Sequence, residues 1–129
     1  MRNTMYWVEI PVKNFERAKS FYEGIFDIEI GLVPMPRGKY GIFPLDMEAQ
    51  GAGGAIVEGE GYEPSENSEK GPIIYLDRGD DLNNPLSKIE KAGGKILLPK
   101  TKNGTNGEFG FIAHFIDSEG NRMGFHSNM

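Results

Sequence analysis

Apolar residues recur along this chain at two spacings, one typical of strands and one typical of helices. An alternating, β-branched segment at 6–12 predicts a strand that ends near Pro11. A stripe at helical spacing follows, and Asn14 stands where a helix N-cap is expected. The stripe consists of Phe15, Ala18, Phe21, Tyr22, Ile25 and Phe26. Beyond it, the pattern assigns strands to 28–33, 39–44 and 55–57.

The second half of the chain repeats this order. A strand is predicted at 72–77, followed by a helix that begins at a cap on Asp80 or Asn84 and ends at glycines 93–94. The next strand is predicted at 95–98, and an irregular excursion follows it. The expected buried face of the helix consists of Leu82, Leu86 and Ile89.

The segment 110–129 has the pattern of a β-hairpin. Two runs rich in Phe and Ile flank a cluster of turn formers at 117–121. Gly120 and Asn121 can adopt the positive φ that such a turn needs, and Asp117 can hydrogen-bond its own backbone as the turn opens.

Strand, helix and three strands therefore occur twice. This predicts an α+β fold of two βαβββ modules with curved mixed sheets that enclose a cleft. The modules are expected at about 1–60 and 72–129, joined by the polar segment 58–71 within a single domain, 1–129. The residues that we expect to be buried are Val8, Ile10, Phe21, Phe26, Leu86, Ile89, Met123 and Phe125.

Composition narrows the classes of function. The 129 residues include no cysteine, which excludes a disulfide scaffold, a Cys-ligated zinc and a thiol nucleophile. The net charge of −5, without any Lys/Arg cluster, argues against a nucleic-acid partner. No apolar run reaches membrane-spanning length, and Glu9 interrupts the apolar N-terminal stretch, so we expect a cytoplasmic protein without a membrane partner.

Several short segments, taken in order, resemble the glyoxalase I, bleomycin-resistance and extradiol-dioxygenase superfamily, the vicinal oxygen chelate group. These segments are 8–12, 16–22, 53–55, 92–95 and 117–127, and together they span nearly the whole chain. The chain is most similar to the small glyoxalase-like, lactoylglutathione-lyase-related members. The resemblance implies paired βαβββ modules, a ligand cleft and a two-fold homodimer.

The resemblance also implies a divalent metal held by four side chains on the concave faces of the sheets. In this sequence the first ligand position falls on Trp7 and the last on Gly124. The fifth-strand ligand falls on Ile73 or Ile74, and the fourth-strand ligand falls within 54–57. None of these side chains coordinates a metal, so we predict no metal at the family position and no cofactor.

Strand alternation selects the candidate residues of the cleft. If Val8 and Ile10 face the helix, Trp7 and Glu9 point into the cleft, and the same parity places Tyr75 and His126 there. Trp7, Tyr75 and Phe115 are candidates for a wall that stacks on a flat ligand. Glu9 and His126 are the tentative catalytic pair, because a carboxylate beside a neutral imidazole can move a proton.

Each candidate also has a simpler interpretation. Glu9 fits a solvated strand glutamate, His126 fits a histidine with an ordinary structural hydrogen bond, and the aromatic residues fit a core. The placement of His114 and Glu58 stays open at this point.

Two functions follow from these observations. The first is a glyoxalase-like protein of unassigned substrate that binds a small organic molecule in a metal-free cleft. The alternative is an enzyme of the lyase or isomerase type that uses Glu9 and His126, or a recruited divalent metal.

Overall fold

The computed structural model describes residues 3–46, 48–49 and 51–129. The first module consists of β1 (Trp7–Pro11), α1 (Phe15–Phe26), β2 (Gly31–Met35), β3 (Gly38–Ile42) and β4 (Gly53–Gly59). The second consists of β5 (Ile74–Leu76), α2 (Asn83–Leu86), α3 (Ile89–Ala92), β6 (Lys95–Lys102), β7 (Phe111–Ile116) and β8 (Arg122–Ser127).

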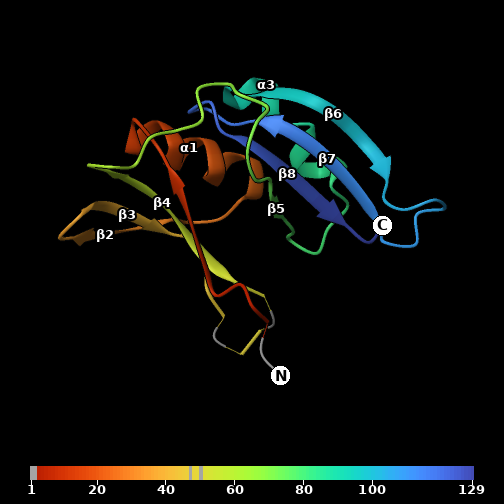
Figure 1. Ribbon diagram of the computed structural model, residues 1–129, viewed down its shortest axis with the longest axis horizontal. Helices are drawn as coiled ribbons and strands as arrows, with labels where there is room; N and C mark the ends of the chain where they lie inside the picture. The colour runs from red at the N-terminus through yellow and green to blue at the C-terminus, as the bar shows by residue number, and fades with distance from the viewer. Residues whose placement is uncertain (1–2, 47, 50) are drawn as a thin grey trace.

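Each module forms a mixed sheet of four strands, and Figure 1 shows how the two sheets are arranged. The strand orders are β1-β4-β3-β2 and β5-β8-β7-β6, so the first strand of each module lies at an edge beside the last strand. β1 runs parallel to β4, and β5 runs parallel to β8, whereas the other pairs are antiparallel. The predicted α+β fold of two βαβββ modules is therefore confirmed.

Helix α1 begins at the N-cap that its sequence predicts. The side chain of Asn14 accepts a hydrogen bond of 3.0 Å from the backbone N–H of Arg17, which satisfies one of the free donors of the first turn. Glu58 of β4 accepts another, of 2.7 Å, from the N–H of Phe15. The helix ends at Asp27, which has a φ of 53° in the left-handed region.

Where the sequence predicts one second helix, the structure has two short helices, α2 and α3. Residues Ser87 and Lys88 interrupt it, where the N–H of Lys88 bonds to the carbonyl of Pro85 three residues back. The predicted caps, Asp80 and Asn84, were wrong. Asn84 lies inside α2, and the carboxylate of Asp81 accepts the hydrogen bond from the backbone of Asn83.

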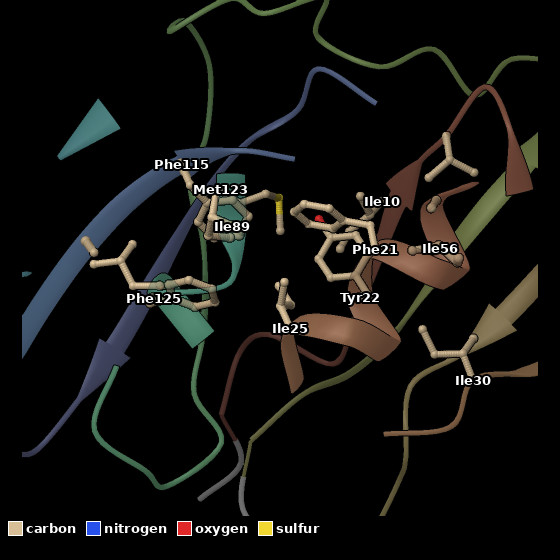
Figure 2. Packing of buried hydrophobic residues seen from close by; sticks show 14 of the residues in the cluster. Ile10, Phe21, Tyr22, Ile25, Ile30, Ile56, Ile89, Phe115, Met123 and Phe125 are labelled. Carbon is tan, nitrogen blue, oxygen red and sulfur yellow. The ribbon is translucent and has the colours of Figure 1, made fainter. Parts of the chain in front are cut away.

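The helices lie together between the two sheets, and one apolar core joins both modules (Figure 2). Phe21 of α1 lies 6.3 Å from Phe115 of β7, centroid to centroid, while α1 also contacts β3 and β4. We call the sheet faces turned to this core the inner faces and the opposite ones the outer faces. Of the residues predicted to be buried, Val8 and Phe26 are only partly buried, and the other six are fully buried.

Within the described part of the chain, none of the helices has the length and apolar character needed to cross a membrane.

Candidate functional site

Two aromatic rings lie over glycines at equivalent places in the two modules. On the outer faces, Trp7 of β1 stands opposite Gly53 of β4, and Tyr75 of β5 stands opposite Gly124 of β8. A Cβ atom on Gly53 would lie 2.9 Å from the ring of Trp7, and one on Gly124 would lie 2.6 Å from the ring of Tyr75. Each ring thus fills space that only glycine leaves free. Gly53 comes one residue before the range 54–57 in which the fourth-strand ligand was expected.

The observed register shows which residue of β5 faces Gly124. Tyr75, and not Ile73 or Ile74, stands opposite Gly124. Ile74 pairs with Met123 and belongs to the inner face, where it packs against the core. Because the strand is short and the linker before it has no period, the sequence left its register open.

The four side chains at these positions do not fit a divalent metal. Trp7, Gly53 and Gly124 offer no side-chain atom that coordinates. The phenol oxygen of Tyr75 is engaged with Nε2 of His114 at 2.7 Å. Within residues 3–46, 48–49 and 51–129, there is no group of three or more His, Asp or Glu side chains that could hold a metal ion.

A groove of about 400 Å³ lies between the two modules, with residues of the edge strands β1 and β5 in its walls. This volume is within the usual range of small-molecule pockets. Gly53 and Tyr75 both line it, so each ring–glycine pair adjoins the groove. Its apolar walls include Val8, Ile10, Phe26, Ile28, Ile74 and Leu76.

Glu9 lies on the outer face of the first module among aromatic residues. Nε1 of Trp7 donates to one carboxylate oxygen at 3.3 Å, and the hydroxyl of Tyr62 donates to the other at 2.7 Å. Tyr62 also shares a hydrogen bond of 2.9 Å with Tyr40. This bond, burial and the negative charge of Glu9 raise the pKa of Tyr40 to about 12. Sequence reasoning missed Tyr62, because it lies in the linker and no pattern there predicts its direction.

The expected hydrogen bond between Glu9 and His126 is absent, and this expectation was wrong. Nδ1 of His126 lies 2.7 Å from the carboxylate of Asp77, and Nε2 lies 3.0 Å from the carbonyl oxygen of Phe109. The bond to Asp77 and the contact with Phe109 raise the pKa of His126. Strand alternation could have predicted this partner, because Asp77 follows Tyr75 by two residues and so lies on the same face of the sheet.

His114, whose placement the sequence left open, points to the outer face beside Tyr75. It stands opposite Gly124, and its ring centroid lies 5.6 Å from that of Tyr75. Burial and the positive charge of Arg122 lower the pKa of His114.

Phe115 does not line a cleft, so its assignment to the ligand wall was wrong. Its side chain is fully buried on the inner face and stacks on Phe125 at 4.4 Å between ring centroids. The register of β7 and β8 decides this, because Phe115 stands opposite Met123, which is also a core residue.

The comparisons with known proteins identify the family. The profile of the Glyoxalase/Bleomycin resistance protein/Dioxygenase superfamily matches residues 4–125. The chain belongs to this superfamily. A search of curated proteins returned no significant match.

Solved structures share the superfamily fold at low sequence identity. TnmS3, an antibiotic binding protein from Streptomyces sp. CB03234, has a TM-score of 0.64 and 20% identity, with 98% of each chain covered. A fosfomycin resistance protein from Listeria monocytogenes has a TM-score of 0.65 and 17% identity, with 100% of this chain and 96% of that chain covered. A glyoxalase I mutant from Zea mays has a TM-score of 0.71 and 18% identity, with 95% of this chain but only 45% of that chain covered. At these identities the likeness shows the fold alone.

The segment 117–121, part of the superfamily resemblance, joins the two modules of this member. Asp117 accepts hydrogen bonds from the backbone N–H groups of Glu119 and Asn121, as predicted for the turn, and from the buried hydroxyl of Tyr22 on α1. The side-chain amide of Asn121 donates to the carbonyl oxygen of Pro11 at 2.8 Å. Burial raises the pKa of Asp117, and the hydrogen bonds that it accepts, which lower the pKa, only partly offset this effect.

Glu119 makes the second link between the modules. One of its carboxylate oxygens accepts the backbone N–H groups of Lys13 and Asn14 at 2.9 and 2.8 Å, and Arg17 donates to both oxygens. Burial opposes ionisation of Glu119, but the hydrogen bonds from Arg17 and the backbone lower its pKa on balance. The signature turn of this superfamily member therefore stabilises the fold and does not face the groove.

Proposed function

We propose that this protein binds a small organic molecule in the groove between its modules, without a divalent metal at the family position. Trp7 and Tyr75 supply aromatic surface beside the groove, and Glu9 and His126 supply polar groups at the outer faces. The observation that carries the proposal is the pair of rings over glycines, because it puts aromatic surface where the resemblance implies metal ligands.

The properties of the groove support this proposal. Its walls are largely apolar and come from both modules, as is usual for a small-molecule site. Tyr75 is 43% exposed, so its ring is available to a ligand. TnmS3, which shares the fold, is an antibiotic binding protein, and this supports the proposal of a small-molecule site.

A fluorescence and thermal-shift screen of aromatic compounds tests the proposal. The chain has one tryptophan, Trp7, so a ligand beside it changes the intrinsic emission directly. We expect at least one compound to raise the melting temperature and quench Trp7, and Tyr75→Ala to weaken its binding by about tenfold. Tyr6→Ala is the matched control, since Tyr6 is 86% exposed and does not line the groove. If no compound in a broad screen binds, or if both variants weaken binding equally, the proposal fails.

A lyase or isomerase activity is the second candidate function. Two observations favour it. Tyr75 and His114 share a hydrogen bond of 2.7 Å on the outer face of the second module. The lowered pKa of His114 keeps its imidazole neutral near pH 7, so it can accept a proton. Turnover of a thiol hemiacetal that is lost in His114→Gln would support an enzyme. Ligand binding without turnover would support the binding protein.

We also propose that two chains form a homodimer. The outer faces point away from the core of a single chain, and the edge strand β2 exposes Leu32, Val33 and Met35. A second chain would cover such apolar edges and enclose the outer faces. Light scattering at micromolar concentration tests this, and a monomer mass would reject it.

A further inference from the structure

We propose that the outer face of the first module binds the positively charged group of an organic ligand, with the Glu9 carboxylate as its counter-charge. The aromatic surface around this carboxylate comes from Trp7 and Tyr62, and the buried Tyr40 packs against Tyr62. The inference rests on the proposed function and adds the chemical class of the ligand, an organic cation with an apolar or aromatic part.

In the part of the chain that the structure describes, the donors that hold the Glu9 carboxylate are neutral. Trp7 and Tyr62 each donate to a different oxygen, at 3.3 and 2.7 Å. A carboxylate offers about four acceptor positions, so about two remain for a ligand. The group is therefore oriented by the protein but not saturated.

No cation of the described chain neutralises this carboxylate. Glu9 takes part in none of the ion pairs found among the described residues. Arg37 contacts the aromatic cluster, but its Nη1 atom donates a hydrogen bond of 3.4 Å to the hydroxyl of Tyr62 and forms no ion pair with Glu9. Because Glu9 is partly buried, a ligand cation would supply the charge partner that the protein leaves out.

The aromatic residues beside Glu9 suit a cation as well. Tyr40 and Tyr62 meet edge to face, with 6.3 Å between ring centroids, and Trp7 packs in the same cluster. The faces of aromatic rings carry negative potential and attract ammonium groups that come within about 6 Å. Trp7 lies over Gly53, which lines the groove, so the aromatic cluster around Glu9 begins at the edge of the groove, although Glu9 itself is not part of the groove walls.

The second module shows why the cation belongs to the first. Asp77 follows Tyr75 by two residues, as Glu9 follows Trp7, so the two carboxylates hold equivalent places. Asp77 already has a basic partner in His126, at 2.7 Å. Among the described residues Glu9 has no such basic partner, and this difference between the two carboxylates selects Glu9.

Three probes of similar shape and different charge test the inference at pH 7: benzylamine, benzyl alcohol and benzoate. Binding is measured by Trp7 fluorescence and by calorimetry. We expect benzylamine to bind about tenfold more tightly than benzyl alcohol, and benzoate to bind most weakly. Glu9→Gln keeps the size of the side chain and should bring benzylamine to the affinity of benzyl alcohol. Glu60→Gln removes the same charge from an exposed position and should leave the tenfold preference intact.

The outcomes separate this inference from the proposed function. If benzyl alcohol binds and Tyr75→Ala weakens it, but benzylamine has no advantage, the inference fails and the proposed function stands. If none of the probes and no compound of a broad screen binds, both fail. If Glu9→Gln does not fold, Tyr62→Ala replaces it and should reduce benzylamine affinity several-fold more than benzyl alcohol affinity. An equal loss for both probes would overturn the inference.

Discussion

The hydroxyl of Tyr22 on α1 donates a hydrogen bond of 2.7 Å to Asp117 in the turn between β7 and β8, and both side chains are almost completely buried. The bond joins residues 95 positions apart in the chain. It also ties the helix of the first module to the closing hairpin of the second.

Tyr22→Phe should therefore destabilise the whole fold. The change removes the hydroxyl while the ring stays, and a buried carboxylate oxygen loses one donor, which costs about 1–3 kcal/mol. Urea unfolding should show a lower midpoint with an unchanged slope. Tyr6→Phe, at an exposed position without a hydrogen bond in the described structure, should change the free energy of unfolding by less than about 0.5 kcal/mol. Equal stability of both variants would mean that the buried bond contributes nothing.

Gly124→Ala should disturb the fold through Tyr75. The new methyl group would lie 2.6 Å from the ring and 3.2 Å from the carbonyl oxygen of Ala113, so we expect a loss of about 1–3 kcal/mol. In a Tyr75→Ala background the ring is gone, and the same change should cost clearly less. A double-mutant cycle of unfolding free energies measures this coupling. Strict additivity would show that the ring does not lie on the glycine.

The two histidines of the chain should titrate on opposite sides of their ordinary value of about 6.5. The raised pKa of His126 gives stability that is present below pH 6.5 and is lost as the pH rises through its folded-state pKa. The lowered pKa of His114 acts in the other direction: below pH 6.5 the unfolded chain takes up a proton that the folded chain does not, so stability falls.

Single variants separate the two histidines. In His114→Gln, the urea midpoint should fall as the pH rises from 6.5 to 8.5. In His126→Gln, it should fall as the pH drops from 7 to 5.5. Proton NMR titration of the two imidazoles in the unmodified protein gives the order of the two pKa values directly. A higher pKa for His114 than for His126 would mean that at least one of the two shifts has the wrong direction.

Protein purified without chelator should contain far less than one zinc or nickel per chain. The resemblance places metal ligands on Trp7 and Gly124, and the residues that face these two across the sheets are Gly53 and Tyr75, so this group does not form a ligand set. Elemental analysis measures the content, and EDTA should leave the melting temperature unchanged. One equivalent of metal, with a melting temperature that EDTA lowers, would refute this prediction.

Much of the fold was readable from local patterns. The stripe of α1 and its cap at Asn14 fixed the first helix, and alternation in β1 placed Trp7 and Glu9 on the outer face. These features depend on neighbouring residues only, and the sequence contains that information.

The errors concern long-range pairing. Phe115 was assigned to the cleft because the apolar run of β7 does not show which face is inside, and only its register with β8 decides that. Glu9 was paired with His126 because both have the right parity. Its actual partners are Trp7 and Tyr62, and Tyr62 comes from a linker whose path no periodicity predicts.

The carboxylate of Glu119 accepts the backbone N–H groups just before α1 from a distance of more than a hundred residues along the chain. During synthesis, the first module emerges from the ribosome with these donors unmatched and before Phe115, against which Phe21 packs, has been made. It reaches its final form only when the last hairpin has followed, so the nascent chain exposes apolar helix surface for nearly the whole of its translation. Variants that weaken the Glu119 link should therefore lower the yield of folded protein in cells by a larger factor than their loss in free energy of unfolding would predict.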